Sequence, residues 1–182
     1  MRAGIIGIGS YLPDNVVTNT ELEKIVDTSN EWIVERTGIL SRRTAEKHIG
    51  SSDLGAEAAK LAIKNANLKP EDIDMIISAS STPDHTFPAT ACIIQDKIKA
   101  TNAAAFDIQA ACTGFVYGLI TAAQYIMTGL YKNILVVGSE VLSKMVDWQD
   151  RNTCVLFGDG AGAVVVSQVE TGGVLSSILG AD

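Results

Sequence analysis

The sequence of 182 residues is poor in cysteine, histidine, proline and basic side chains. Its 3 cysteines are widely spaced, and neither of the 2 histidines lies at metal-ligand spacing from any of them, so we expect neither a zinc site nor a disulfide framework. With 14 basic against 21 acidic residues the net charge is −7, which argues against binding to nucleic acid or to an anionic membrane. The 47% of hydrophobic residues, against 19% charged and only 4 prolines, excludes a disordered chain.

The chain also lacks an obvious targeting segment. No N-terminal stretch is apolar enough for a signal peptide, so we expect the chain to stay in a reducing cytoplasm. Residues 108–131 run for 24 positions without a charge, which is long enough to span a bilayer. This segment contains Gln109 and Gln124 and has no flanking basic cluster, so we expect a helix buried inside a layered domain, not a membrane span.

Short apolar runs alternate with helical patterns along the chain. This alternation predicts an α/β fold with parallel strands joined by crossover helices. The run 134–137 is apolar without alternation, as expected of a strand covered on both faces. From residue 154 onward two β-runs surround a glycine-rich turn, and we expect the sheet to end in an antiparallel strand. The predicted strands are 4–8, 73–79, 103–108, 133–138, 154–157, 163–169 and one from 174, and the predicted helices are 53–68, 89–98 and 111–130.

The helix predicted after Ser52 has a clear amphipathic pattern. Ser52 is a plausible N-cap, because its hydroxyl can accept a hydrogen bond from an amide of the first turn. Its apolar positions fall on one face, which we expect to be buried, and they are Leu54, Ala58, Leu61 and Ala62.

Two glycine-rich segments do not match the pattern of phosphate-binding loops. Gly7 and Gly9 follow the first strand, but Leu12 stands where a third glycine is needed and Pro13 follows where a helix should run, so the dinucleotide fingerprint fails. Residues 158–162 lead into a β-run instead of a helix, so they offer no helix N-terminus to a phosphate. We expect a tight turn or a close backbone approach there.

Cys112 lies where a predicted strand gives way to a predicted helix beginning near Ala111. Unpaired amides and the dipole at a helix N-terminus favour thiolate over thiol, which makes Cys112 a candidate nucleophile. A free cysteine is more often a small buried side chain, and we expect that role for Cys92 and Cys154. For Cys112 its position alone leaves both roles open.

Trp32 and Arg36 are four residues apart and therefore share a helical face. A flat aromatic beside a guanidinium suits a nucleotide, with stacking for the base and charge for the phosphate. A packing tryptophan beside a surface Glu–Arg pair is the alternative. We expect His48 and His85 to be ordinary loop residues.

Five segments together resemble one known family. They are GSYLP at 9–13, TSNEWIVERTGI at 28–39, TFPA at 86–89, AACTGF at 110–115 and FGDGAGA at 157–163. In this order they resemble the β-ketoacyl-acyl-carrier-protein synthase III family of bacterial type II fatty-acid synthesis, over essentially the whole chain. The resemblance implies a thiolase-like fold, in which residues 1–182 form one of two pseudo-symmetric α/β halves with a mixed, mostly parallel sheet covered by helices. The C-terminal half would be absent from the chain.

The resemblance also implies a reaction. Acyl-CoA acylates Cys112, and malonyl-acyl carrier protein then decarboxylates and attacks the thioester, which gives a 3-oxoacyl-acyl carrier protein. Acyl-CoA is a substrate here, and neither a cofactor nor a metal is implied. Trp32 and Arg151 would sandwich the adenine of CoA, and Phe87 would enter the acyl pocket from the other subunit of a homodimer. The implied site residues are Cys112 as nucleophile, Thr28, Trp32, Arg36 and Arg151 for CoA, and Phe87, Leu142 and Phe157 for the acyl chain.

The family's catalytic histidine and asparagine lie in the second half of longer chains, and neither His48 nor His85 sits in a matching motif. We therefore expect residues 1–182 alone to be incomplete for condensation. One alternative is another thiolase-like acyltransferase, of the hydroxymethylglutaryl-CoA synthase or polyketide type, although those relatives generally lack the Trp–Arg pair. The other alternative is a non-catalytic α/β half that binds CoA or assembles with a partner.

Overall fold

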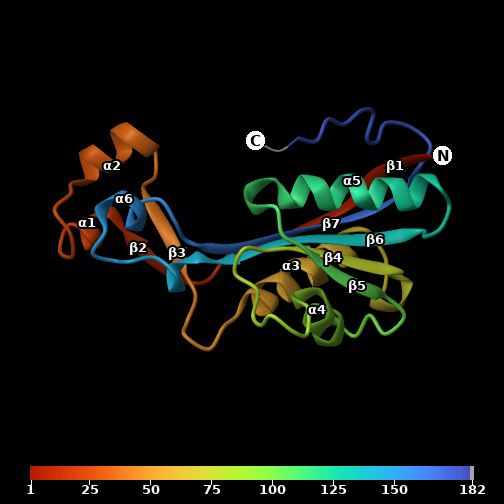
Figure 1. Ribbon diagram of the computed structural model, residues 1–182, viewed down its shortest axis with the longest axis horizontal. Coiled ribbons are helices and arrows are strands. Elements are labelled where there is room, and N and C mark those ends of the chain that lie inside the picture. The colour runs from red at the N-terminus through yellow and green to blue at the C-terminus, as the bar shows by residue number, and fades with distance from the viewer. Residues whose placement is uncertain (181–182) are drawn as a thin grey trace.

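The computed structural model describes residues 1–180, and its five main strands form one mixed sheet in the order β1-β7-β6-β4-β5 (Figure 1). These strands are β1 (Arg2–Tyr11), β4 (Met75–Ala79), β5 (Ala104–Ile108), β6 (Asn133–Val141) and β7 (Asp159–Val169). β4 runs parallel to β5 and β6, whereas β7 is antiparallel to both β6 and β1. The α/β prediction is confirmed, and so is its antiparallel final strand. Two of the four strand pairings are parallel and two are antiparallel, so the sheet is mixed but not mostly parallel.

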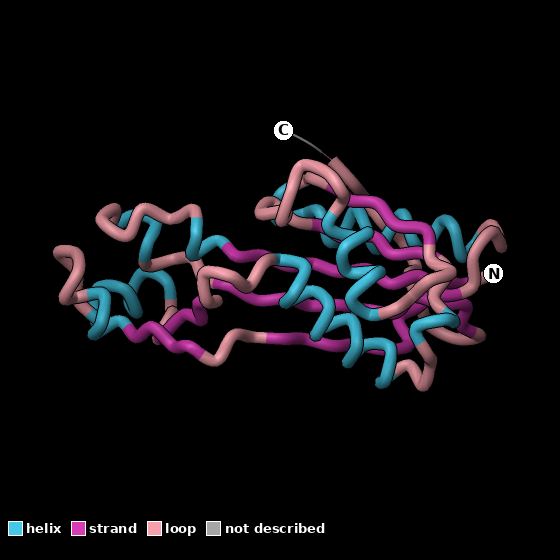
Figure 2. The backbone as a smooth tube through the Cα atoms, turned by 90° about the horizontal axis from the view of Figure 1, so that it is seen from below, coloured by secondary structure: helices cyan, strands magenta, loops and turns pink. Residues whose placement is uncertain are grey.

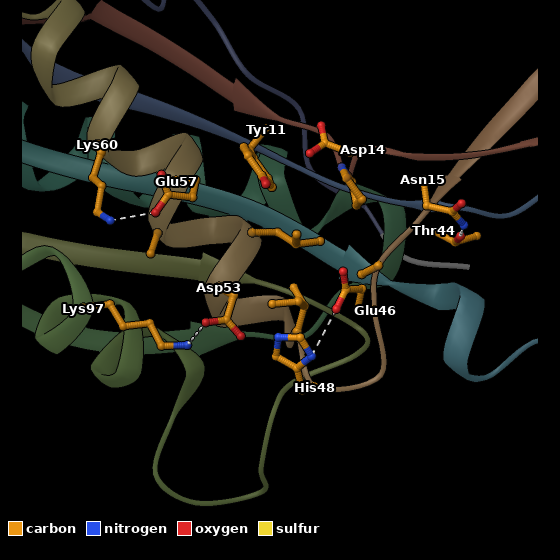
Figure 3. Close-up of a pocket in the computed structure, with 15 residues that line it drawn as sticks. Tyr11, Asp14, Asn15, Thr44, Glu46, His48, Asp53, Glu57, Lys60 and Lys97 are labelled. Atoms are coloured by element: carbon orange, nitrogen blue, oxygen red, sulfur yellow. Dashed lines mark hydrogen bonds and ion pairs between the residues drawn. The ribbon is translucent and has the colours of Figure 1, made fainter.

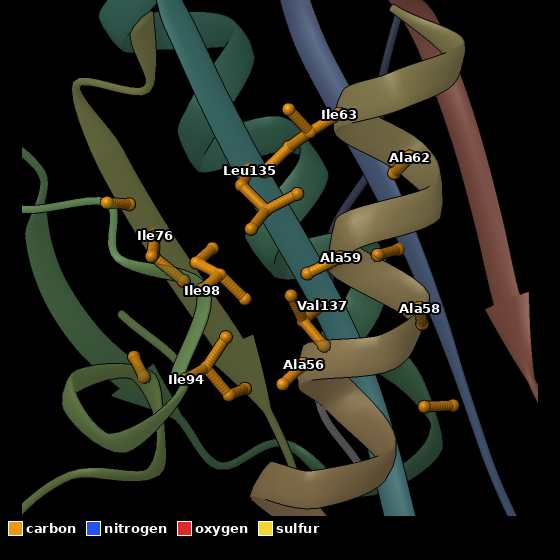
Figure 4. Close-up of a cluster of buried hydrophobic side chains, with 14 of the residues drawn as sticks. Ala56, Ala58, Ala59, Ala62, Ile63, Ile76, Ile94, Ile98, Leu135 and Val137 are labelled. Carbon is orange, nitrogen blue, oxygen red and sulfur yellow. The ribbon is translucent and has the colours of Figure 1, made fainter. Parts of the chain in front are cut away.

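Helices cover both faces of this sheet and lie along its strands (Figure 2). α3 (Ser51–Asn65) and α4 (Thr90–Ile98) pack on one face, and α5 (Gly114–Met127) packs on the other. Successive β6 residues alternate between the two layers: Leu135 and Val137 face α3 and α4 (Figure 4), while Ile134 and Val136 face α5. All four are 0% exposed, which explains why this strand is apolar without alternation.

Glycines in β1 allow α3 to lie directly against the strand. A Cβ atom at Gly9 would come within 2.2 Å of the Ala58 carbonyl oxygen, and one at Gly7 within 2.3 Å of the Ala62 carbonyl oxygen. Neither glycine can therefore be replaced without moving the backbone of α3. The Gly7–Gly9 pattern serves helix–strand packing, in agreement with the failed dinucleotide fingerprint.

A second group of elements, here called the end lobe, lies beyond the end of the sheet where β1 and β6 finish (Figure 1). It holds the antiparallel hairpin of β2 (Asn15–Thr18) and β3 (Ser41–Thr44), together with α1 (Asn19–Leu22), α2 (Asn30–Thr37) and α6 (Arg151–Cys154). The two short strands of this hairpin were not predicted from the sequence. The lobe has its own small core, formed by Leu22, Ile33, Cys154 and Val155.

The strand predicted at 154–157 is wrong. Asp150 accepts a hydrogen bond from the Asn152 amide at 3.0 Å and another from the Thr153 hydroxyl at 2.8 Å, which starts the helical turn of α6 instead. Residues 155–158 then lead into β7 without strand structure.

The glycine-rich segment 158–162 is not a tight turn, because β7 begins at Asp159. Close backbone approach is the correct part of that prediction, since a Cβ at Gly158 would come within 3.0 Å of the Arg43 carbonyl oxygen. The strand predicted from Val174 is absent from residues 174–180, where a single backbone hydrogen bond of 2.8 Å joins the Val174 amide to the Ala3 carbonyl.

The start of α3 also differs from the prediction. Gly50 is the N-cap, and its amide donates to the Asp53 carboxylate at 2.8 Å, so Ser52 lies inside the helix. Leu61 is 39% exposed, which removes it from the predicted buried face. The other predicted positions of that face are buried, namely Leu54, Ala58 and Ala62.

The uncharged segment 108–131 folds as the end of β5, a short 3-10 helix, η2 (Ala111–Thr113), and then α5. Two further 3-10 helices in the described residues are η1 (Pro70–Asp72) and η3 (Leu142–Lys144). Within residues 1–180, no helix combines the length and the apolar character that crossing a bilayer requires.

Candidate active site

Cys112 lies on a sharp turn between the carboxyl end of β5 and the start of α5. The residue before it, Ala111, has a φ of +45°, a left-handed conformation that few residues other than glycine adopt. The Thr113 hydroxyl donates to the Ala110 carbonyl at 2.8 Å and closes the turn. The turn leaves Cys112 exposed, within η2 and two residues before α5 begins. The predicted position at a helix N-terminus is therefore correct to within one short 3-10 turn.

The other two cysteines have different surroundings. Cys154 is fully buried in the core of the end lobe, and burial raises the pKa of its thiol. Cys92 is half-buried on α4, with its sulfur 3.9 Å from the Ala105 carbonyl oxygen. Among the three thiols, only that of Cys112 is exposed.

Trp32 has two arginines close to its ring in the end lobe. Its indole lies 4.9 Å from the Arg36 guanidinium and 5.0 Å from the Arg151 guanidinium, measured to the ring centroid. Ser29 caps α2 by accepting a hydrogen bond from the Trp32 amide at 3.1 Å, which fixes the start of the helix that carries both Trp32 and Arg36. The shared helical face predicted for Trp32 and Arg36 is confirmed, and Arg151 joins them from α6.

The space between Trp32 and Arg151 is closed. A flat base between them needs two van der Waals spacings, about 7 Å, and the observed distance is 5.0 Å. The Arg151 guanidinium also donates to the Asp27 carbonyl at 3.0 Å. Next to this carbonyl, the hydroxyl oxygen of Thr28 is buried and has no hydrogen-bond partner within residues 1–180.

Two of the three predicted acyl-pocket residues come together. Leu142 and Phe157 line one hollow of about 180 Å³, beside Met145 and Thr153. Phe87 is not among the residues that line this hollow; it lies on the loop before α4 and is 88% exposed.

A cavity of about 570 Å³ lies along the first turns of α3 (Figure 3). α3 is on the opposite face of the sheet from α5. Two ion pairs at its wall are short: Asp53 to Lys97 at 2.6 Å and Glu57 to Lys60 at 2.6 Å. None of the predicted site residues lines this cavity. Across the described part of the chain, no three His, Cys, Asp or Glu side chains gather in a way that could hold a metal ion.

Arg42, which the sequence did not single out, is only 5% exposed. Its guanidinium lies inside the end lobe and donates hydrogen bonds to three oxygens, two from residues 17–19 and one from Val155. The available signal was the Arg42–Arg43 pair, because neighbouring residues of a strand point to opposite faces and one of the two arginines had to point inward.

Comparison with known proteins identifies the family to which the chain is similar. The family described as 3-Oxoacyl-[acyl-carrier-protein (ACP)] synthase III matches residues 106–182. Over 100% of this chain, proteins named Beta-ketoacyl-[acyl-carrier-protein] synthase III are 61% identical in Caldanaerobacter subterraneus and, under the name synthase III 1, 60% identical in Bacillus anthracis. The chain belongs to the β-ketoacyl-acyl-carrier-protein synthase III family. It spans 55% and 59% of the length of these two relatives.

Solved structures of synthase III proteins and related enzymes share the fold. The crystal structure of 3-oxoacyl-[acyl-carrier-protein] synthase III from Aquifex aeolicus has a TM-score of 0.90 at 56% identity, covering 93% of this chain and 55% of that one. The priming β-ketosynthase of the R1128 polyketide pathway has a TM-score of 0.91 at 36% identity, covering 93% of this chain and 51% of that one. The predicted thiolase-like fold is confirmed.

Proposed function

We propose that this synthase III chain supplies the nucleophile and the CoA-binding end of an enzyme that starts fatty-acid chains in the cytoplasm. The observation that carries the proposal is the exposed thiol of Cys112 on a strained turn at the carboxyl end of β5. A non-glycine residue held at positive φ costs free energy, and such strain is characteristic of turns that aim a reacting group. The names of the 60–61% identical relatives support the same reaction class.

In the proposed first step, the Cys112 thiolate attacks the carbonyl carbon of an acyl-CoA. A new carbon–sulfur bond forms, the bond to the CoA sulfur breaks, and CoA leaves as a thiolate that takes a proton from solvent. In the second step, malonyl-acyl carrier protein loses CO₂, and its enolate carbon attacks the acyl group on Cys112. The Cys112 thiolate is released and 3-oxoacyl-acyl carrier protein is the product. The thiolate makes this two-step path possible, because the intermediate thioester stays reactive toward carbon.

The proposed adenine site is the space between Trp32 and Arg151, with Arg36 and Thr28 beside it. Both guanidiniums already lie near the indole, and guanidinium and indole faces both stack on planar rings. The buried Thr28 hydroxyl has a hydrogen bond to offer a ligand. Since the base does not fit in the closed space, Arg151 has to move aside when CoA enters.

We further propose that residues 1–182 form one of two halves of the active enzyme, and that a second half supplies the groups that stabilise the enolate. The chain spans 55–59% of the length of its relatives, which fits this division. The exposed Phe87 fits a role in the acyl pocket of a second copy, next to the hollow formed by Leu142 and Phe157. Acyl-CoA is a substrate in this scheme, and no cofactor takes part.

The direct test is the covalent intermediate. The full-length enzyme containing this sequence is incubated with acetyl-CoA alone, and its intact mass is measured after acid quenching. We expect one acetyl group per chain, located on the peptide with Cys112, and none in Cys112→Ala. Cys92→Ala is the matched control and should acylate normally. Acylation that persists in Cys112→Ala would refute the assignment of the nucleophile.

A further inference from the structure

Arg42 is a buried cation without a carboxylate partner. It is 5% exposed, and no ion pair within residues 1–180 includes it. Burying a charge is costly unless hydrogen bonds compensate, and burial lowers the pKa of this guanidinium. Here neutral oxygens compensate in part: the Val17 carbonyl at 3.1 Å, the Asn19 side-chain carbonyl at 2.9 Å and the Val155 carbonyl at 3.2 Å. The buried Nε of Arg42 has no hydrogen-bond partner within residues 1–180.

One branch of these contacts leads to the helix that carries Trp32. Asn19, which accepts from Arg42, uses its own NH₂ group to donate to the Asn30 side chain at 3.1 Å and to the Ile39 carbonyl at 2.8 Å. Asn30 is the first residue of α2, and Ile39 follows shortly after its end. Asn19 therefore holds α2 from both sides, and Arg42 holds Asn19.

The other branch leads to the helix that carries Arg151. The Val155 carbonyl, which accepts from Arg42 at 3.2 Å, directly follows the last residue of α6. α6 has only four residues, and Arg151 is the first of them. One guanidinium thus connects the two elements that face each other across the proposed adenine site, and Figure 1 shows α2 and α6 close together in the end lobe.

We propose that Arg42 is a positioning residue that fixes α2 and α6 relative to each other, and through them the affinity for CoA, without touching the ligand. This inference depends on the proposed function, because it takes the space between Trp32 and Arg151 to be the adenine site. The planar arginine guanidinium has five N–H donors and can hold three acceptors from different elements at fixed angles. The compact ammonium group of lysine cannot fix these angles. The conservative change to lysine should therefore keep the charge and lose the alignment.

The test compares Arg42→Lys with Arg43→Lys in the full-length enzyme. Arg43 is a matched control, since it is the next residue of β3 and its guanidinium bonds only to the Pro13 carbonyl at 3.0 Å and the Asp14 carbonyl at 3.3 Å, away from α2 and α6. Calorimetry gives the Kd for CoA, and steady-state kinetics give KM for acetyl-CoA and kcat. For Arg42→Lys we expect Kd and KM to rise about ten-fold with kcat within about two-fold, as for about 1.4 kcal/mol of lost binding. Arg43→Lys should stay within about two-fold in all three.

Three results would overturn the inference: an unchanged Kd in a folded Arg42→Lys enzyme, an equal loss in Arg43→Lys, or a fall in kcat with KM unchanged. If Arg42→Lys does not fold, Asn30→Ala decides, because it removes one contact between Asn19 and α2 at a half-buried position. An about three-fold rise in Kd supports the inference and an unchanged Kd refutes it, because this variant removes a single hydrogen bond between Asn19 and α2. Failure of the wild-type enzyme to bind CoA would instead refute the proposed function.

Discussion

Replacing Gly9 by alanine should destabilise the protein strongly, although the change adds only one methyl group. The new Cβ would lie 2.2 Å from the Ala58 carbonyl oxygen and 2.4 Å from the Ala62 amide nitrogen, both in the backbone of α3. Ordinary contact begins near 3.4 Å, so α3 would have to retreat by about 1.2 Å. The buried side of α3 packs tightly on the sheet, and small-to-large changes in such places cost about 1–3 kcal/mol.

We expect Gly9→Ala to lower the free energy of unfolding by about 3 kcal/mol, because the new methyl group would clash with backbone atoms, which cannot move aside as a flexible side chain can. In urea denaturation, with a slope of about 2 kcal/mol per molar, the midpoint should fall by about 1.5 M with the slope unchanged. Gly162→Ala is the matched control, since a Cβ there has nothing within 4 Å, and it should be neutral or stabilising by up to about 1 kcal/mol. Equal midpoints for the wild type and Gly9→Ala would refute the view that these glycines set the distance between α3 and β1.

Further predictions concern the thiols, the proposed adenine site and the response to pH. Near pH 7, iodoacetamide should label Cys112 much faster than Cys92 or the buried Cys154, and equal rates measured by peptide mass spectrometry would contradict the nucleophile assignment. Trp32→Ala should weaken CoA binding about ten-fold, or roughly 1–2 kcal/mol, with little effect on malonyl decarboxylation; an unchanged calorimetric Kd would return Trp32 to a packing role. Burial raises the pKa of Asp53, but hydrogen bonds from a lysine and an amide outweigh it and hold the pKa below its usual value. Such a carboxylate stabilises the fold above about pH 4 and loses this effect as the pH falls, so the stability difference between wild type and Asp53→Asn should be largest near pH 7 and shrink by pH 3. A difference independent of pH would count against this ion pair.

The parts of the fold predicted correctly are those governed by local pattern. The apolar residues 134–137 fill both faces of a central strand, as a short run rich in β-branched residues and without alternation predicts. The spacing of Trp32 and Arg36 likewise fixes their contact, because four residues make about one helical turn. Local pattern also placed the turn with Cys112 between β5 and α5, through its small residues and the change from strand to helix periodicity.

The parts predicted wrongly depend on contacts between distant residues. Residues 154–157 have strand-forming side chains, but the Asp150 cap and the burial of Cys154 in the end lobe make a helical turn there. Arg151 reaches Trp32 across more than a hundred residues, so only resemblance to a family could pair them before the structure was known. Arg42 was not identified because a strand arginine is usually exposed, and its three acceptors come from two distant segments, residues 17–19 and Val155.

The closed stack of Arg151 on Trp32 makes ligand entry an exchange rather than an insertion. In the free protein Arg151 already covers the indole, so the arrival of a base buries little additional indole surface from water. The base gains two stacking contacts, one with Trp32 and one with Arg151, but it breaks the existing contact between these two side chains. The net binding free energy is smaller still if the Arg151 hydrogen bond to Asp27 also breaks. The base alone would therefore bind weakly, and most of the affinity for CoA would come from the rest of the molecule. A free adenine nucleotide would then compete poorly with acyl-CoA, even though it carries the same ring.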